Sequence, residues 1–369
     1  MDVPDCSGFV FWSILRDAAA RLLRMRAAQT GLQLRTIMSS QIPRPGEFEL
    51  IARHFAPIAG PGGLDLLDDA GLLRPGRGYE LVVTADALVA GVHFFPDDPP
   101  DAIGWKALAV NLSDLAAKGA RPEGFVLTLA LPHGWTEAWL AGFVAGLGRM
   151  AEEARCPLIG GDTVSTAGPL TLSITAFGTV PAGRMVRRAG ARPGDVVLVS
   201  GSIGDGALGL KAHGPDKPGW VASLALEQRA FLADRYLHPQ PRHALAEALQ
   251  RHASAAMDVS DGLVGDLAKL LKASGVGAEI DLDSVPLSPA ARAALMADPA
   301  LAELAWTGGD DYEILCTASE REYPALIAAA EGSMLPLTPI GRVTAEAGVV
   351  TYREQGRLRS FAQGSFSHF

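Results

Sequence analysis

The chain has 369 residues, a length that suits two ordinary domains better than one, and its formal net charge of −9 at pH 7 argues against a nucleic-acid partner. Its three cysteines, Cys6, Cys156 and Cys316, form no C-x-x-C pair, so a disulfide framework and a zinc knuckle are not expected, and the cytoplasm is the default location. No apolar run approaches the length of a membrane span, and the acidic balance suits a protein that collects cations.

The first 40 residues differ in character from the rest. They contain an apolar patch that is too short to span a membrane, followed by an Arg-rich amphipathic segment. A targeting or membrane-surface role fits this pattern, and so does a plain extension without any role in the active site. We expect residues 1–40 to lie outside the fold, with Met38 as a candidate for the functional start.

Helical and strand patterns alternate from residue 46 to about residue 180. Apolar spacing and breaker residues predict helices over 47–55, 101–118 and 136–154, and strands over 81–85, 124–131, 157–159 and 170–180. A boundary near Pro181 then separates an N-terminal domain, residues 46–180, from a C-terminal domain, residues 181–369.

Residues 181–369 show the same mixture of helical and strand patterns. Two helices are expected on either side of residues 239–241, with further helices over 207–212 and 263–274 and strands over 195–200, 254–257 and 278–283. Because both parts mix strands with helices, the predicted class is α/β or α+β, with a mixed sheet and flanking helices in each of two domains.

Acidic residues stand beside short apolar runs in several places. Asp86, Asp162 and Asp258 each follow such a run, and side chains at strand ends project into the crevice where mixed sheets bind ligands. Asp114 either pairs with Lys118 on the same helix or joins the other acids. Two unit charges about 4 Å apart repel by roughly 4 kcal/mol at an effective dielectric near 20, so carboxylates that converge on one cleft must take up protons or hold cations. Ligands made of oxygen alone favour Mg²⁺, Mn²⁺ or Ca²⁺ over zinc.

Two further acids and a glycine-rich turn have equally ordinary alternatives. Asp69 fits a metal site or a turn, and Asp261 fits a metal site or the N-cap of the helix over 263–274. The segment VSGSIGDGALG, residues 199–209, is typical of a strand, a glycine-rich turn and a helix start, which together suit an anion. The basic residues before it predict either a solvated loop or a clamp on ATP phosphates; they are Arg184, Arg187, Arg188 and Arg192.

Ten segments between Gly46 and Phe369 carry a resemblance to a known family. They are GEFELIARHF, LDDAGLL, VVTADALVAGVHF, WKALAVNLSDLAAKGA, LIGGDT, GRMVRRAGARPGD, VSGSIGDGALGL, MDVSDGLVGDL, TGGDDYEI and the terminal SHF. In this order they resemble the thiamine-monophosphate kinase family, which belongs to the superfamily that includes aminoimidazole ribonucleotide synthetase. The resemblance covers nearly all of the chain after the extension.

The resemblance implies an ATP-dependent kinase that phosphorylates thiamine monophosphate to thiamine pyrophosphate by in-line phosphoryl transfer. It implies ATP as co-substrate, several Mg²⁺ ions, a homodimer in which the N-terminal sheets pair, and an active site in the cleft between the domains. The acceptor is a phosphate that is already ionised at neutral pH, so the reaction needs charge neutralisation rather than a general base. Neither nucleic acid nor a membrane is an expected partner.

The resemblance also assigns site residues in this sequence. His93 has an alternative as a histidine satisfied at a strand edge, and Phe366 either stacks on a thiamine ring or packs in the core. The implied nucleotide-binding residues are Gly161, Arg188 and Ser260, and the implied substrate-binding residues are His93, Asp310 and Phe366. The implied metal ligands are Asp69, Thr84, Asp86, Asp114, Asp162, Asp258 and Asp261, of which Asp86, Asp114, Asp162 and Asp258 are the expected catalytic residues.

Some positions depart from the family pattern. Leu66 and Leu67 stand where glycine is usual before the paired aspartates, and leucine does not readily take a positive φ, so this loop is expected to differ. Ala85 replaces a hydroxyl residue, and Asp310 replaces a glutamate. Two alternative functions therefore stay open: another ATP-dependent synthetase of the superfamily, and a catalytically decayed relative that binds metal and nucleotide.

Overall fold

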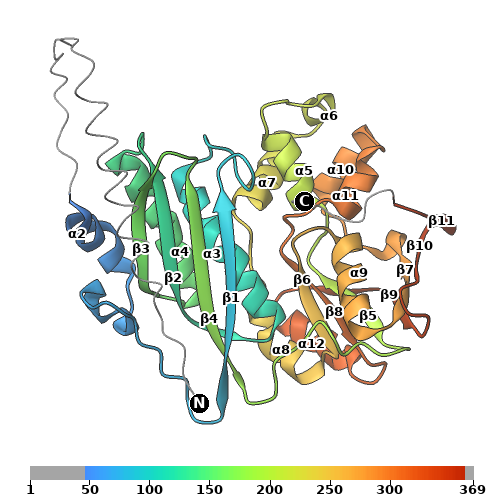
Figure 1. The fold of residues 1–369 in the computed structure, drawn as a ribbon. Coiled ribbons are helices and arrows are strands. Elements are labelled where there is room, and N and C mark those ends of the chain that lie inside the picture. The colour runs from blue at the N-terminus through green and yellow to red at the C-terminus, as the bar shows by residue number, and fades with distance from the viewer. Residues whose placement is uncertain (1–45, 362–369) are drawn as a thin grey trace, which may run out of the picture. The chain divides into compact units, whose positions relative to one another are not determined.

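The computed structural model describes residues 46–361, in which two sheets are flanked by helices (Figure 1). The predicted fold class is confirmed. The predictions for residues 1–40 and for Phe366 lie outside the described residues. None of the helices between residues 46 and 361 is both long and apolar enough to cross a membrane.

The first sheet has four strands in the order β1-β4-β2-β3. Strands β1 and β3 are the outer strands in this order, and among the described residues the free side of β3 is paired only at Leu158, through a bridge with Ala59. The strands are β1 (Tyr79–Val89), β2 (Arg121–Pro132), β3 (Leu158–Thr166) and β4 (Thr171–Pro181). Short helical segments precede them: α2 (Glu47–Leu50), η1 (Ile51–Phe55), η2 (Ala56–Ile58) and η3 (Pro61–Leu66).

Two long helices, α3 (Pro100–Ala117) and α4 (Glu137–Ala154), pack together beside this sheet (Figure 1). Alternation along β4 explains why they cover one face, since Leu172, Ile174 and Ala176 are buried while the residues between them are partly exposed. The predicted N-cap of α4 is confirmed, because the Thr136 hydroxyl accepts a hydrogen bond from the Trp139 N–H at 3.1 Å.

Helix α3 is buried on nearly every side, because it also packs against strands of the second sheet. That sheet has seven strands in the order β11-β10-β7-β9-β5-β8-β6, with β7 and β10 parallel. Its strands are β5 (Val196–Ser200), β6 (Ala255–Val259), β7 (Gly277–Asp281), β8 (Glu313–Ala318), β9 (Leu337–Thr344), β10 (Val350–Glu354) and β11 (Arg357–Arg359). A polar side chain on α3 can therefore reach residues of either sheet.

Helices surround the second sheet. They are α5 (Asp205–His213), α6 (Gly219–Ala222), α7 (Leu226–Leu237), η4 (His243–Leu245), α8 (Ala246–His252), α9 (Leu263–Ser274), η5 (Leu282–Ser284), α10 (Pro289–Ala297), α11 (Leu301–Thr307) and α12 (Tyr323–Gly332). The predicted helix over 263–274 matches α9, which ends at Gly275 with a φ of 68°, a backbone conformation that glycine adopts without strain.

Two predicted strand ends are wrong. Asp86 and Asp162 lie inside β1 and β3 rather than just beyond them. The apolar runs that mark these strands are shorter than the ladders, because pairing with β4 and β2 continues through the small and polar residues that follow. Asp258, in contrast, is the last residue but one of β6.

Candidate active site

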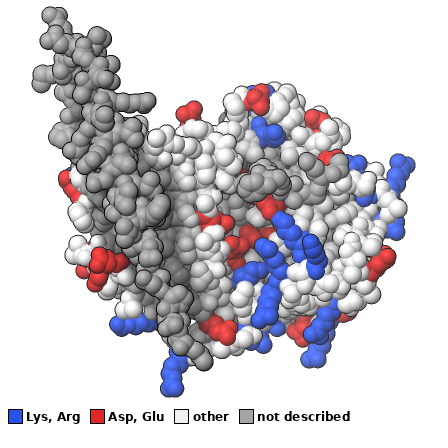
Figure 2. Space-filling view, in the orientation of Figure 1, with Lys and Arg blue, Asp and Glu red and all other residues white. Residues whose placement is uncertain are grey.

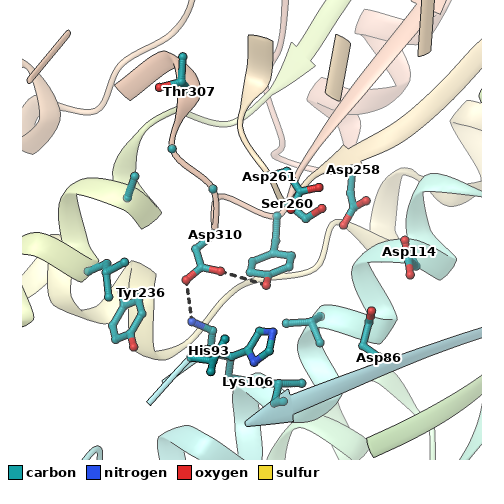
Figure 3. A pocket seen from close by; sticks show the side chains of 18 of the residues that line it. Asp86, His93, Lys106, Asp114, Tyr236, Asp258, Ser260, Asp261, Thr307 and Asp310 are labelled. Carbon is teal, nitrogen blue, oxygen red and sulfur yellow. Dashed lines mark hydrogen bonds and ion pairs between the residues drawn. The ribbon is translucent and has the colours of Figure 1, made fainter. Parts of the chain in front are cut away.

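A cavity of about 660 Å³ is lined by both halves of the described chain. Strand β1 and helix α3 contribute from one side; the β6–α9 turn and the α11–β8 loop contribute from the other (Figure 3). On the face shown in Figure 2, acidic and basic side chains gather near the middle of the molecule. The predicted site residues that line this cavity are Asp86, His93, Asp114, Arg188, Asp258, Ser260, Asp261 and Asp310.

Four carboxylates occupy one side of the cavity: Asp86, Asp114, Asp258 and Asp261 (Figure 3). Burial raises the pKa of Asp86 to about 6, and the charges of Asp114 and Asp261 add to that shift. Burial likewise raises the pKa of Asp258 above its usual range, with the charge of Asp114 adding to it. The carboxylates thus repel one another across the cavity, which is the electrostatic setting predicted for a cation site.

Hydroxyl groups beneath the cavity orient two of these acids. The Ser113 hydroxyl donates to Asp258 Oδ2 at 2.7 Å, and the Thr84 hydroxyl donates to Asp114 Oδ2 at 2.5 Å. Thr84 does not itself line the cavity. Lys118 donates to the carbonyl of Ala256 at 2.8 Å, and the charge of Asp114 acts on it as well.

The donor set consists of oxygen atoms, which suit a hard divalent cation. Within residues 46–361, no three acidic, histidine or cysteine side chains converge closely enough to hold an ion by themselves. The carboxylates are instead spaced around the cavity wall, which leaves coordination positions for other oxygen atoms. Mg²⁺ commonly binds in this way, through one or two carboxylates together with water and substrate phosphates.

A third aspartate near the β6–α9 turn has a structural role. Asp266 is fully buried, and its Oδ2 accepts hydrogen bonds from the N–H groups of Ser260 at 3.0 Å and Asp261 at 2.9 Å. Lys269 donates to Asp266 at 2.8 Å and also to Asp261. Asp261 is not the N-cap of α9, because Gly262 occupies that position. Asp266 therefore holds the turn that presents Ser260 and Asp261 to the cavity.

On the other side of the cavity, the predicted residues Asp310 and His93 lie with three side chains that the sequence analysis did not single out, Lys106, Tyr236 and Tyr312. Lys106, on α3, donates to Asp310 Oδ2 at 2.9 Å, and its Nζ lies 4.0 Å from the centroid of the Tyr236 ring. The Tyr312 hydroxyl donates to the other oxygen of Asp310 at 3.1 Å. His93 lies nearby, and its Nδ1 accepts the Val89 N–H at 3.0 Å, which places the proton of a neutral imidazole on Nε2 (Figure 3).

The glycine-rich turn was predicted to bind a phosphate through its backbone amides. For two of these amides the prediction is wrong. The N–H groups of Gly204 and Gly206 donate to the carboxylate of Asp311, at 2.7 and 2.9 Å. The chain's own carboxylate therefore occupies the amides that a phosphate would need. Among the four arginines before this turn, Arg188 lines the cavity, whereas Arg184 donates to the carbonyl of Gln250 at 3.0 Å.

Three other predicted site residues, Asp69, Gly161 and Asp162, are exposed and do not line the cavity. Asp162 is on β3, which β2 and β4 separate from β1. Cross-strand register places Asp162 on the sheet face of Ala87, so Asp162 and Asp86 point to opposite faces.

The loop before Asp69 keeps a left-handed backbone in spite of its leucine residues. Leu64, Asp65 and Leu66 have φ values of 51°, 60° and 56°. The expectation that leucine would exclude positive φ here is therefore wrong for Leu66, while Leu67 has an ordinary φ of −107°. Such conformations cost of order 1 kcal/mol or more per residue outside glycine.

Comparisons with known proteins agree over most of the described chain. Two family descriptions match: AIR synthase related protein, N-terminal domain, over residues 67–180, and AIR synthase related protein, C-terminal domain, over residues 192–353. Thiamine-monophosphate kinase of Caulobacter vibrioides is 43% identical over 314 residues, which are 84% of this chain and 87% of that protein.

Solved structures resemble the fold as well. The crystal structure of thiamine-monophosphate kinase from Stenotrophomonas maltophilia K279a has a TM-score of 0.72 and 42% identity, covering 80% of this chain and 91% of that one. AaThiL complexed with AMPPCP and TMP has a TM-score of 0.69 and 30% identity, covering 88% of this chain and 97% of that one.

Proposed function

The chain belongs to the AIR synthase related family and, within it, to the thiamine-monophosphate kinases, and from this premise we propose how its own residues perform the reaction. It is an enzyme that uses ATP to phosphorylate thiamine monophosphate, giving thiamine pyrophosphate. One observation carries the assignment of its site: carboxylates from both halves of the chain line a single cavity.

The cavity divides into two ends with different chemistry. Asp86, Asp114, Asp258 and Asp261 form the end where the phosphates of ATP and the acceptor meet, and Arg188 and Ser260 at that end bind the nucleotide. Asp310 and His93 form the end that takes the organic part of thiamine monophosphate. Because the acceptor phosphate is ionised at neutral pH, the residues bind and align two polyanions rather than remove a proton.

We propose several Mg²⁺ ions at the carboxylate end, each held by one or two of the four acids Asp86, Asp114, Asp258 and Asp261 together with phosphate and water oxygens. When bound, they supply charge neutralisation for the phosphates and for the four acids. Ser113 and Thr84 keep the Asp258 and Asp114 carboxylates aimed for this role through their hydrogen bonds. The raised pKa values of Asp86 and Asp258 support the proposal, because burial and then the charge of Asp114 disfavour their ionised forms, and a bound cation would offset both effects.

We propose that residues 46–180 form the metal- and ATP-binding domain and residues 181–369 the C-terminal domain. The division is supported by the two sheets, whose strands lie on either side of Pro181 in sequence. The cytoplasm is the proposed location, because ATP is the co-substrate.

A homodimer is the proposed assembly, in which the four-stranded sheets of two copies pair through their outer faces. On the outer face of β1, Leu81 is 42% exposed and Val83 is 55% exposed, and Val164 on β3 is 44% exposed. Among the described residues, α3 and α4 cover only the opposite face. Exposed apolar side chains on the face of a sheet favour an interface.

The dimer also offers a role for Asp162. Three strand spacings, about 14 Å, separate β1 from β3, and Asp162 points away from the Asp86 face, so the two cannot share an ion within one chain. A two-fold dimer that brings β3 of one copy beside β1 of the other would bring Asp162 toward the strand of the partner subunit that carries the acidic end of its cavity. We therefore propose that Asp162 and the adjacent Gly161 act at the site of the second copy.

The function is tested by measuring ADP release with purified protein, ATP and MgCl₂, in the presence and absence of thiamine monophosphate. We expect ADP release to depend strictly on thiamine monophosphate. Binding of both compounds without turnover would instead indicate a decayed relative, and turnover with a different acceptor would indicate another synthetase of the superfamily.

The carboxylate end predicts a pH-dependent stability in the absence of metal. The pKa of Asp86 is about 6 in the folded protein and that of Asp258 is also raised, so the folded state binds protons more tightly than the unfolded chain. Stability therefore declines as the pH rises from about 4 through 6 and above. We expect Mg²⁺ to raise the melting temperature by several degrees more at pH 8 than at pH 5.

Thermal unfolding in EDTA or MgCl₂ at both pH values measures this effect. Asp258→Asn is the internal comparison, because it removes one titrating group and should reduce the loss of metal-free stability between pH 5 and pH 8. An equal Mg²⁺ effect at both pH values, or an unchanged loss in this variant, would contradict the prediction.

A further inference from the structure

We propose that Lys106 is a positioning residue for the acceptor: it fixes the carboxylate of Asp310 and thereby sets the affinity for thiamine monophosphate but not for ATP. This inference rests on the proposed role of Asp310 at the organic end of the cavity. Lys106 lies in the segment WKALAVNLSDLAAKGA, but the sequence analysis gives it no role.

The first observation is that Lys106 is buried and paired across the molecule. It is only 3% exposed, and its Nζ donates to Asp310 Oδ2 at 2.9 Å although the two residues are 204 positions apart (Figure 3). A buried ammonium group is costly unless a carboxylate compensates it. The 4.0 Å approach of Lys106 Nζ to the Tyr236 ring centroid adds a cation–π contact that fixes the lysine further.

The second observation is that the backbone around Asp310 has little freedom. Asp310 and Tyr312 have φ values of 71° and 52°, in the left-handed region that residues other than glycine rarely adopt. Asp311 between them is anchored to the amides of Gly204 and Gly206. A Cβ on Gly206 would lie 2.1 Å from the Asp310 carbonyl oxygen, so the glycine permits this close approach.

The same loop continues into a buried ion-pair network at Glu313. Glu313 is fully buried and accepts hydrogen bonds from Arg235 at 3.0 Å, from Arg242 Nε at 2.7 Å and from Ser200 at 2.6 Å. With the main chain fixed on both sides, the remaining freedom of Asp310 is rotation of its carboxylate. Lys106 and the Tyr312 hydroxyl each hold one oxygen and remove that freedom.

A fixed carboxylate of this kind suits the organic part of the acceptor. A carboxylate can accept about four hydrogen bonds, and Lys106 and Tyr312 use two of these, one on each oxygen. The remaining positions can accept from the amino group of an aminopyrimidine ring, and the charge attracts the cationic thiazolium ring. Asp310 has a short side chain, and Lys106 on α3 holds its carboxylate at the organic end of the cavity.

The test is a kinetic comparison of Lys106→Met, Lys106→Arg and Asp310→Asn with the wild-type enzyme. In Lys106→Met we expect KM for thiamine monophosphate to rise roughly tenfold to a hundredfold, the usual loss when a charge-assisted hydrogen bond is no longer held in place, and KM for ATP to stay within about twofold. Lys106→Arg keeps a cation next to Asp310 and should recover part of that loss. Lys272→Met, which removes an exposed lysine on α9, is the matched control.

A double-mutant cycle separates positioning from general destabilisation. If Lys106 acts through Asp310, Lys106→Met should change KM for thiamine monophosphate by no more than about twofold when Asp310 is already asparagine. An unchanged KM in Lys106→Met, an equal rise in both KM values, or additive effects in the double variant would overturn the inference while leaving the proposed function intact. A wild-type enzyme without thiamine-monophosphate-dependent ADP release would overturn both. Lys106→Met protein that fails to fold would count against a purely positioning role, and Lys106→Arg then supplies the comparison of the two KM values.

Discussion

Asp258→Asn is expected to lower kcat by about a thousandfold while leaving the metal-free protein folded and at least as stable as the wild type. The substitution removes one of the four negative charges at the carboxylate end of the cavity and keeps the shape of the side chain. Burial and the charge of Asp114 already disfavour the ionised form of Asp258, so a neutral residue of the same size fits there. Its amide oxygen can still accept the hydrogen bond from Ser113.

Steady-state kinetics over a range of MgCl₂ concentrations measures the loss of kcat. Thermal unfolding in EDTA measures the stability of the metal-free protein. Asp114→Asn should give a comparable loss of kcat, because Asp114 belongs to the same carboxylate end and its charge acts on Asp258. Asp216→Asn makes the same chemical change at an exposed carboxylate away from the cavity and should leave kcat unchanged. Near-wild-type turnover of Asp258→Asn at saturating Mg²⁺ would contradict a role in holding the cation.

The sequence predicts most elements in the first 283 residues because their signals are local. Helix α9 is an example: its apolar spacing and the glycine at its end lie within a dozen residues. No element was predicted after residue 283, where the structure has four more strands. Strand β8 is buried on both faces, so it shows no alternation, and a short apolar run of this kind is ambiguous in sequence.

The residues of the candidate site also fall into those that the sequence predicts and those that it does not. Carboxylates such as Asp114 and Asp258 are predictable because an acid in an apolar segment is costly and needs a reason. The partners of the TGGDDYE segment are not predictable, since Asp310 meets Lys106 and Asp311 meets Gly204 only after distant segments pack together. The same limit explains the error at the glycine-rich turn: its amides are suited to an anion, but sequence does not tell a phosphate from a carboxylate of the same chain.

Mixed dimers made from two inactive variants are expected to recover activity if Asp162 serves the site of the second copy. Asp162→Asn should be nearly inactive by itself, although the residue is exposed and lies outside the cavity of its own chain. In a mixed dimer with Asp258→Asn, one site carries both substitutions and the other carries neither. The mixed dimer purified through both tags should therefore have about half of wild-type activity, since one of its two sites is intact, and the unpurified random mixture should have about a quarter.

The experiment uses co-expression of the two variants with different affinity tags and assays the doubly purified dimer for thiamine-monophosphate-dependent ADP release. The matched control pairs Asp114→Asn with Asp258→Asn. Both residues line the cavity of one chain, so every site in that mixed dimer keeps one substitution and should stay inactive.

Recovery in the first pair alone requires that Asp162 and Asp258 of different chains meet at one site. Full activity of Asp162→Asn alone would remove this residue from the reaction, and no recovery in either pair would place its function within its own chain. The outcome therefore decides whether one chain holds a complete active site, which the exposed position of Asp162 on the sheet face opposite Asp86 argues against.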